Sequence, residues 1–577
     1  MADITAPEYI SPYVVTTSGG LVLDRDVYTM PVGAASILQN FEPSVQGGYR
    51  RLSGTTKYTS SQVGGSSNTI LGVAIFNNGV VAAQSTNVYF GTGSTWSSID
   101  SGRTSAGRYR FEKYNFSTNE ERLIFADGAN AASVYNGTTV MDIKGATTIS
   151  TTGSASSSST SLTGLASTAG IMEGMYIGGT NIGSGAKVSA ISGTTVTMSV
   201  ATTGTISGGT VTFAGLGTAP SDPSMVVAFK NHMFYAGMSS EPNTIIFSAI
   251  GDENDFTTSN GAGSLNVDST IIALKSFRGE LIIFCEDRIY KLAGASRSDF
   301  AIAPISRNVG CSDAFSIQEL GGDVIFLAPD GLRTIAGTAR IGDVELGTVS
   351  KQIQARIGDI GFTNISSVVI RDKSQYRLFY PSGGVESTAK GIIGVLKSNP
   401  SGQIGWEYSD IRGIKPSCCD SGFISGVEKV IHGGFDGYVY LQESGNSFDG
   451  TAMKAIYRSP DLTMGDAGIR KNMQRINVNY DPEGSVNASL FVKYDFEDTG
   501  TPQPSAYTLT TADTAAVYDD SGSLYGSAVY DAEGMPIVRQ SVEGSGFTVV
   551  VRLEDESTNP PITLKGFELE FTPGARM

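Results

Sequence analysis

Histidine and cysteine are scarce in this chain, which has two histidines and four cysteines among 577 residues. The histidines, His232 and His432, lie within or beside expected strands, and no Ser/His/Asp set can be argued from their spacing. The cysteines lack the paired spacing of a zinc site; they are Cys285, Cys311, Cys418 and Cys419. We expect structural or surface histidines and reduced thiols, with a disulfide between the adjacent Cys418 and Cys419 as the alternative.

Basic residues are too few for a protein that grips nucleic acid. Lys and Arg number 40 against 56 Asp and Glu, which gives a formal net charge of −16. Binding through phosphates needs clustered Lys and Arg, so this class is disfavoured. An acidic surface remains compatible with DNA that slides past it without sticking.

Several segment types are also missing. No run of about 18 apolar residues is present, so no transmembrane helix is expected. Residues 1–8 lack the basic start and apolar core of a signal peptide. We expect a protein that is soluble when it is made in a cytoplasm; if it acts outside the cell, it leaves by a route other than secretion.

Known catalytic motifs are absent as well: there is no HExxH, Walker loop or Rossmann fingerprint. A glycosidase needs only two carboxylates across a cleft. Among 56 acidic residues such candidates are always present, so their presence neither supports nor excludes a glycosidase. We expect no enzyme activity, and we assign no catalytic, cofactor-binding or metal-ligating residue and no cofactor.

Glycine, by contrast, is abundant, with 71 residues. Together with Ser, Thr and β-branched runs it predicts many short strands joined by tight turns. Residues 69–76 and 80–84, for example, flank the hairpin signal Asn77-Asn78-Gly79. An apolar strand, a Gly/Asp/Asn turn and an aromatic-rich strand recur at roughly 45 to 55 residues, the period of propeller blades. The fold predicted is all-β, with a propeller of about six blades.

Composition divides the chain into five parts. Residues 1–66 form an irregular platform segment, 67–144 the first blades and 216–445 the remaining blades. Residues 145–215 open with a nearly uncharged Ser/Thr tract and continue with strand patterns. They predict a small inserted β-module, and a disordered linker for the tract is the alternative. Strands in residues 446–577 alternate apolar and polar residues, which indicates a separate sandwich-like β-domain.

Three local patterns carry further expectations. Residues 251–256 (GDENDF) cluster acids in a loop; a solvated turn is expected, and a calcium site is the alternative, although EF-hand spacing is lacking. Asp24 and Asp26 flank Arg25, which predicts a local ion pair. Residues 349–357 place Val349, Ile353 and Ile357 on one helical face and predict a helix capped by Ser350.

The segment of residues 24–51 resembles the opening of tail nozzle and tail hub (stabilisation, tail tubular B-like) proteins of short-tailed bacteriophages. In that family an Asn-Phe-like element, here Asn40-Phe41, precedes a Gly-Gly-Tyr-Arg-Arg-like turn, here residues 47–51. Residues 246–256, 281–291 and 327–332 are similar to the propeller strands of the same family. The resemblance covers residues 10–60 and 215–445, and the insertion departs from it.

The resemblance implies a structural subunit of a six-fold ring in the virion tail, below the portal and adaptor (head–tail connector) proteins. Such a ring forms the distal channel through which genomic DNA is retained and ejected, without sequence-specific binding. It implies tail fibre or spike proteins as further partners, and no catalytic residues to carry over. Contact with the host surface is a further expectation.

Two alternatives stay open. The chain could be a receptor- or glycan-binding propeller of the tail tip, a role that can coexist with the ring through the insertion. It could also be an extracellular hydrolase on a propeller scaffold that uses a carboxylate pair.

Overall fold

The computed structural model describes residues 10–26, 28–105, 107–116, 121–146, 148–336, 348–361, 364–382, 385–398, 404–500, 502–511 and 537–576. The start of the chain, on which the signal-peptide expectation rests, lies outside these ranges. The chain forms two compact units, which are described separately. The first comprises residues 1–70, 92–95 and 315–577, and the second residues 71–91 and 96–314.

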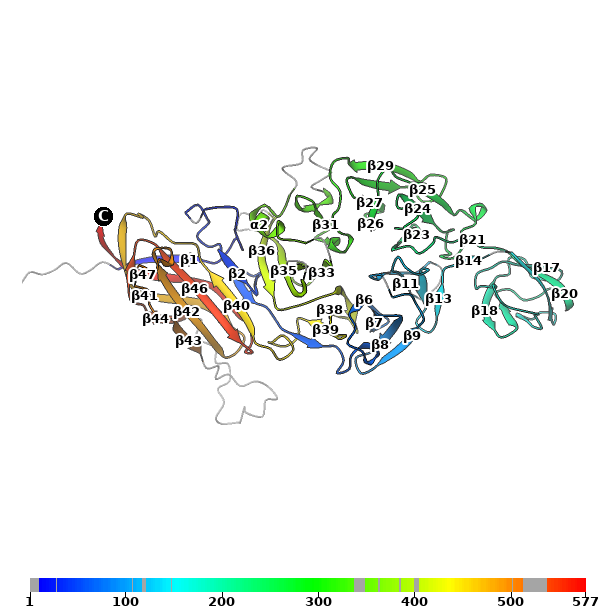
Figure 1. Ribbon diagram of the computed structural model, residues 1–577, viewed down its shortest axis with the longest axis horizontal. Helices are drawn as coiled ribbons and strands as arrows, with labels where there is room; N and C mark the ends of the chain where they lie inside the picture. The colour runs from blue at the N-terminus through cyan, green and yellow to red at the C-terminus, as the bar shows by residue number, and fades with distance from the viewer. Residues whose placement is uncertain are drawn as a thin grey trace, which may run out of the picture. The chain divides into compact units, whose positions relative to one another are not determined.

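The chain is all-β and propeller-like, as predicted, and most of the second unit consists of small four-stranded antiparallel sheets (Figure 1). Their strands are β6 (Ile70–Phe76), β7 (Gly79–Gln84), β8 (Asn87–Gly91) and β9 (Trp96–Asp100); β10 (Arg110–Tyr114), β11 (Arg122–Ala126), β12 (Ser133–Tyr135) and β13 (Val140–Asp142); β22 (Met225–Phe229), β23 (His232–Ala236), β24 (Thr244–Phe247) and β25 (Gly263–Asn266); β26 (Ile271–Phe277), β27 (Glu280–Cys285), β28 (Ile289–Ala293) and β29 (Ala301–Ser306). The turns follow the expected residues: Asn77, Asn78, Lys230 and Asn231 all have positive φ, which Asn tolerates better than most residues.

The Ser/Thr-rich stretch between β13 and β22 folds around a core of its own, which includes Leu162, Met175, Val196 and Phe213. Its strands form one two-stranded sheet and two three-stranded sheets. They are β14 (Gly145–Ala146) and β21 (Gly217–Thr218); β15 (Ile149–Ala155), β20 (Ile206–Phe213) and β17 (Ile177–Gly179); β16 (Ser161–Leu162), β19 (Thr195–Met198) and β18 (Val188–Ser192). Because β14 pairs with β21, the two ends of the stretch lie side by side within the second unit.

The first unit contains three more meander sheets. Their strands are β30 (Gln318–Leu320), β31 (Asp323–Ala328) and β32 (Gly331–Thr334); β33 (Ser366–Ile370), β34 (Gln375–Ser382), β35 (Val385–Ser398) and β36 (Ile404–Arg412); β37 (Cys418–Ile424), β38 (Val427–Gly433), β39 (Val439–Gln442) and β5 (Thr55–Lys57). The last sheet takes its fourth strand from far back in the chain, since Leu441 of β39 lies opposite Thr56 of β5.

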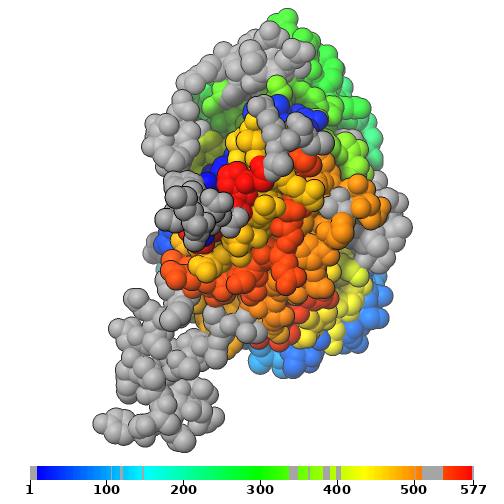
Figure 2. Space-filling view, turned by 90° about the vertical axis from the view of Figure 1, so that its left-hand side faces the viewer, coloured from blue at the N-terminus to red at the C-terminus, as the bar shows by residue number. Residues whose placement is uncertain are grey.

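The C-terminal part of the first unit has two larger sheets around one core, which includes Phe41, Tyr49, Tyr457 and Leu569. A nine-stranded sheet extends β33–β36 through β2 (Ile37–Gln39) to β40 (Met453–Arg458), β46 (Val549–Ser557), β42 (Val486–Tyr494) and β43 (Tyr507–Thr511). The other contains β3 (Phe41–Pro43), β4 (Tyr49–Arg51), β47 (Ile562–Arg576), β41 (Ile469–Pro482), β44 (Ile537–Ser541), β1 (Ser11–Thr16) and β45 (Ser545–Gly546). In Figure 2 blue N-terminal atoms lie among red and orange C-terminal ones, and β1 pairs with β47.

Helical structure is limited to short turns in the described residues. The helix expected over residues 349–357 is shorter: a 3-10 turn, Lys351–Ile353, is followed by one α-helical turn, α2 (Gln354–Ile357). Ile353 and Ile357 are buried, but Ser350 makes no side-chain cap; its hydroxyl oxygen instead accepts a hydrogen bond from the Leu332 N–H at 3.0 Å. The other 3-10 turns are Val63–Gly65, Thr258–Asn260, Ala314–Ser316 and Asp495–Glu497.

Candidate functional site

The residues flagged in the sequence are mostly structural. None of the four cysteines forms a disulfide, so the alternative of a Cys418–Cys419 disulfide is not found. Arg25 and Asp24 approach to 3.9 Å at the surface, as expected of a local ion pair. No helix among the described residues is long and apolar enough to cross a membrane.

The acidic loop at residues 251–256 is not the solvated turn expected from its composition. Glu253, Asn254 and Asp255 are buried, and their groups are used within the protein. Arg122 donates to Glu253 at 2.7 Å, and the Asn260 amide donates to Asp255 at 2.7 Å. Burial of charge is tolerated because each carboxylate has such partners. No group of three or more His, Cys, Asp or Glu side chains in the described ranges is placed to hold a metal ion.

His232 is a buried residue of the second unit, surrounded by aromatic rings. Its Nδ1 lies 2.6 Å from the Ser248 carbonyl oxygen. The rings of Phe247 and Phe300 lie edge-on to the imidazole, with centroids at 5.7 and 5.5 Å. These contacts assign His232 to the hydrophobic interior of its sheet.

The segment that resembles phage nozzle proteins forms the centre of the first unit. The Asn40 backbone N–H donates to the Asp410 carbonyl of β36, and its side-chain amide donates to the Lys454 carbonyl of β40, both at 2.9 Å. Asn40 has φ 53°, a conformation that asparagine adopts more readily than most residues. One residue therefore joins a meander sheet to the C-terminal sheets.

The Gly-Gly-Tyr-Arg-Arg turn has an equally specific role. Gly48 has φ +84°, and a Cβ there would lie 2.5 Å from the Leu564 carbonyl oxygen, so only glycine fits. The Tyr49 hydroxyl donates to the Gly33 carbonyl at 3.0 Å. Arg51 is fully buried and donates to the carbonyls of Asn559 and Ser557 at 2.7 and 2.6 Å. The motif holds backbone from both ends of the chain together.

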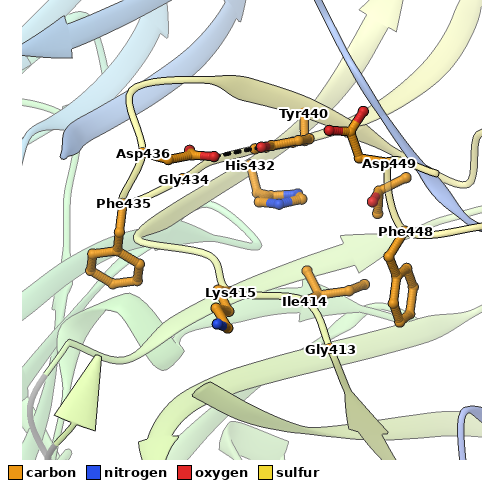
Figure 3. A pocket seen from close by; sticks show the side chains of 11 residues that line it. Gly413, Ile414, Lys415, His432, Gly434, Phe435, Asp436, Tyr440, Phe448 and Asp449 are labelled. Atoms are coloured by element: carbon orange, nitrogen blue, oxygen red, sulfur yellow. Dashed lines mark hydrogen bonds between the residues drawn. The ribbon is translucent and has the colours of Figure 1, made fainter. Parts of the chain in front are cut away.

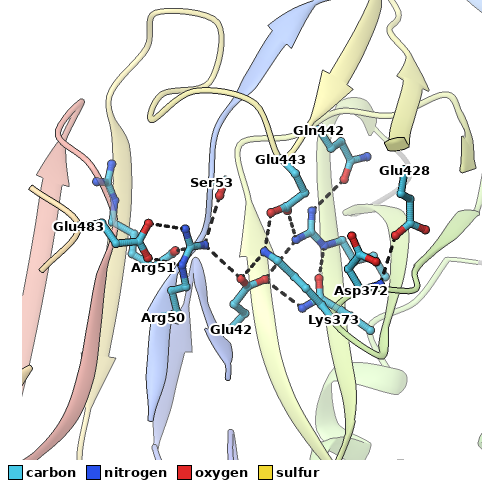
Figure 4. A network of polar contacts seen from close by, with 12 residues as sticks. Glu42, Arg50, Arg51, Ser53, Asp372, Lys373, Glu428, Gln442, Glu443 and Glu483 are labelled. Atoms are coloured by element: carbon cyan, nitrogen blue, oxygen red, sulfur yellow. Dashed lines mark hydrogen bonds and ion pairs between the residues drawn. The ribbon is translucent and has the colours of Figure 1, made fainter. Parts of the chain in front are cut away.

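A buried ion network, called here the Glu42 network, lies beside this turn (Figure 4). Glu42 accepts hydrogen bonds from Lys373 at 2.6 Å and from Arg377 at 3.3 Å. Arg377, 1% exposed, also donates to Glu443 and, at 2.9 Å, to Gln442. The remaining members are Arg50 and Gln375.

The pKa of Glu443 reflects this environment. Burial alone would raise the pKa, but the charges of Arg377 and Lys373 outweigh burial and lower the pKa to about 2. The carboxylate is thus held ionised by its partners. Three segments of the first unit, from β3, β34 and the end of β39, are joined by these charges.

Residues that surround a cavity with room for a ligand lie in another part of the first unit, around His432 (Figure 3). A cavity of about 420 Å³, the His432 pocket, is formed after β36, at the β38–β39 turn and after β39. Its size falls in the range of small-molecule sites. Its lining is Thr55, Gly413, Ile414, Lys415, His432, Gly434, Phe435, Asp436, Tyr440, Phe448 and Asp449.

His432 is 4% exposed, and its imidazole stacks on Tyr440 with centroids 5.1 Å apart and planes 14° apart. Its Nδ1 has no hydrogen-bond partner. Burial lowers the pKa of His432 to about 3, against the opposing effect of Asp436, so the ring is neutral at physiological pH. The sequence interpretation of His432 as a structural or surface residue did not include this unpaired nitrogen.

Two glycines shape the pocket wall. At Gly434 a Cβ would lie 2.3 Å from Oδ1 of Asp436, and the missing side chain lets that carboxylate fold inward. Tyr440 then donates its hydroxyl to Asp436 at 2.6 Å. Burial and this carboxylate raise the pKa of Tyr440. At Gly413, φ +93°, a Cβ would lie 2.7 Å from the Phe448 ring, so Phe448 packs closely over the backbone.

Comparisons with known proteins give no family. No family model matches the chain, and no curated protein matches it. Among solved structures, the computationally designed Ika8 protein is 12% identical over 67% of this chain and 99% of that one, with a TM-score of 0.31. The AfRom2 CNH domain is 8% identical over 67% and 98%, with a TM-score of 0.32. Sqt1 of Saccharomyces cerevisiae is 11% identical over 68% and 99%, with a TM-score of 0.31. Likenesses this distant carry no argument about function.

Proposed function

We propose that this chain is a structural subunit of a phage tail nozzle or hub ring, an oligomer of six copies in the virion. The ring would sit below the portal and adaptor proteins, carry tail fibres or spikes, and form the distal channel for DNA. The resemblance of residues 24–51 motivates the proposal. Their use as the joint between the sheets of the first unit suits a rigid, load-transmitting subunit better than a reaction site.

The observation that carries the proposal is where apolar side chains are exposed. Nearly half of the exposed large hydrophobic residues in the described ranges fall within residues 10–45: Ile10, Val14, Tyr28, Val32, Ile37 and Val45. Apolar side chains gathered in one short segment are typical of protein contacts. Val14, 68% exposed, lies on β1, whose one strand partner among the described residues is β47. An edge strand of this kind can pair with a second copy of the chain.

Charge supports the role of a DNA channel. Each subunit carries a formal charge of −16, and six copies multiply that charge sixfold. An acidic lumen repels phosphates and would let DNA pass without binding. A ring structure whose channel is lined mainly by Lys and Arg would contradict this part of the proposal.

Native mass spectrometry of the full chain, alone and with portal and adaptor proteins, tests the ring. We expect a hexameric ring that is lost in Val14→Asp and Val45→Asp, because each places a charge in the apolar segment. Val200→Asp is the control, since Val200 is also exposed, at 38%, but lies in the inserted module, and it should assemble normally. A persistent monomer under all conditions would overturn the proposal.

A receptor- or glycan-binding role is the second candidate. The His432 pocket is the observation that favours it. A hydrolase is not proposed.

A further inference from the structure

The His432 pocket combines an unused polar atom with aromatic walls. Nδ1 of His432 is buried without a partner, although nearly all buried polar groups in folded proteins are hydrogen-bonded. The rings of Phe435, Tyr440 and Phe448 lie around the same cavity (Figure 3). His432 lines a cavity of about 420 Å³, and a nitrogen without a partner beside such a cavity is the arrangement expected when a ligand supplies the missing partner.

The charges around the pocket favour a neutral occupant. Asp436 and Asp449 bring two carboxylates, and Lys415 brings one ammonium group. Lys57 lies 3.1 Å from Asp449 and offsets the second carboxylate. An anionic ligand would face both carboxylates, and a cationic one would face both lysines, so neither sign of charge is favoured.

The free hydrogen-bonding positions favour a ligand rich in hydroxyl groups. A carboxylate accepts up to about four hydrogen bonds, and Asp436 uses its oxygens for the Tyr440 hydroxyl and, at 3.3 Å, the Tyr438 N–H. Hydroxyl groups can donate to the remaining carboxylate positions and can donate to or accept from a neutral imidazole. Aromatic rings meanwhile offer apolar surface. A ligand with hydroxyls on its edge and C–H groups on its faces satisfies both demands.

We propose that the His432 pocket binds one sugar ring of a neutral glycan, with hydroxyls on Asp436, Asp449 and His432 and a ring face on the aromatic wall. This site lies in the first unit, apart from the inserted module to which a receptor role could be assigned from the sequence. The proposal does not depend on ring assembly. A chain that assembles but binds no glycan overturns this inference alone, and a monomer that binds glycan overturns the ring alone.

The direct test is a glycan array followed by saturation-transfer NMR, both with the full chain. We expect binding to neutral hexose-containing glycans and transfer to one terminal or internal sugar ring. Free neutral monosaccharides then serve as competitors. Absence of any neutral glycan hit, or binding confined to anionic glycans, would overturn the proposal.

Substitutions at the pocket rim test whether the glycan binds in the His432 pocket. Asp436→Asn and Asp449→Asn should each weaken affinity about tenfold, because a hydrogen bond to a charged group contributes on that order. Both residues are exposed at the pocket rim, so folding should be retained. Asp268→Asn, at a carboxylate whose side chain is 84% exposed in the second unit, is the matched control and should leave affinity unchanged. Undiminished binding in the double variant Asp436→Asn/Asp449→Asn would overturn the assignment.

His432→Phe tests the unpaired nitrogen while keeping the stack on Tyr440. Affinity should fall about tenfold, and the loss should be equal at pH 5 and pH 8 because the imidazole stays neutral across that range. If His432→Phe unfolds, titration of the wild-type chain still decides: affinity that changes through pH 6 to 7 would show an ordinary, solvated histidine and contradict the geometry.

Discussion

The Glu42 network and the His432 pocket are two polar regions of the same unit that differ in how their central groups are hydrogen-bonded. In the network, Glu42, Arg377 and Glu443 each have several charged or amide partners. In the pocket, Nδ1 of His432 has none. Buried charge with all its partners holds segments in register, whereas a buried group without a partner costs stability. By this difference the Glu42 network is a structural contact between segments, and the His432 pocket is a candidate ligand site.

Removing Arg377 is the strongest way to break the network. Arg377→Met should lower the free energy of unfolding by about 3 kcal/mol or more, because it leaves Glu42 and Glu443 buried with Lys373 as their shared cation. Urea denaturation followed by tryptophan fluorescence measures the change. Arg25→Met is the control; that side chain is 56% exposed, and we expect a change of about 0.5 kcal/mol or less. Equal losses of unfolding free energy in Arg377→Met and Arg25→Met would show that the network stabilises the fold no more than an exposed ion pair does.

Acid should weaken both regions, in different pH windows. The pKa of Glu443 is lowered to about 2, so its stabilisation is present above its unfolded pKa near 4.5 and is lost as pH falls toward 2. The pKa of His432 is lowered to about 3, so the ring is neutral in the folded and unfolded chain above about pH 6.5. Stability falls from there toward pH 3, because the unfolded chain gains a proton on His432 that the folded chain does not.

Urea midpoints measured from pH 7 to pH 2 separate the two. His432→Phe should flatten the dependence between about pH 6.5 and 4.5, and Glu443→Gln should flatten it below about 4.5. Carboxyl groups with raised pKa, such as Asp555, act in the opposite sense, so each variant is compared with wild type. A His432→Phe profile parallel to wild type above pH 4.5 would refute the assignment.

A smaller effect is expected from Gly434→Ala. The new Cβ would meet Asp436, but the carboxylate is at the end of an exposed side chain and can swing away. Stability should fall by about 1 kcal/mol or less, with loss of the Tyr440–Asp436 hydrogen bond and of glycan affinity. Thermal unfolding and the glycan titration measure the two effects, and Gly405→Ala, at a position of β36 without a positive φ where no atom lies within 4 Å, controls for the pocket.

The smallest expected effect has the opposite sign. His432→Phe at pH 8 should leave stability unchanged or raise it by up to about 1 kcal/mol, because it removes a buried nitrogen without a partner. Stabilising substitutions at sites retained for function are common. Differential scanning calorimetry measures the change. A loss of several kcal/mol would mean that His432 is a structural residue, and the two regions would no longer differ.

Local sequence patterns predicted local structure well. Residues 69–76 correspond to β6 (Ile70–Phe76), and Asn77 and Asn78 form its turn, because apolar runs and turn residues act over short distances. The partners of β2 and β5 could not be read in this way. Each has three residues, too few to show a period, and each pairs with strands hundreds of residues away.

The candidate site was missed for a similar reason. His432 was considered alone, whereas the pocket combines it with Gly413, Phe448 and other residues from separate turns. The sequence 434–437 (GFDG) was visible only as a hairpin turn. Whether Nδ1 of His432 has a hydrogen-bond partner depends on how β38 packs against β39. The spacing of residues in the sequence does not show that packing. The acidic loop at 251–256 shows the converse, since its charge suggested exposure while Arg122 and Asn260 made burial possible.

The fourth strand of the last meander sheet also sets an order of events during synthesis. Thr56 of β5 emerges early from the ribosome, and Leu441 of β39, its partner, follows after nearly four hundred residues. At roughly 5–20 residues per second, β5 waits on the order of 20–80 s with its backbone unpaired. The nascent chain therefore carries an open strand edge for most of its translation, and chaperone demand should fall sharply once β39 is released.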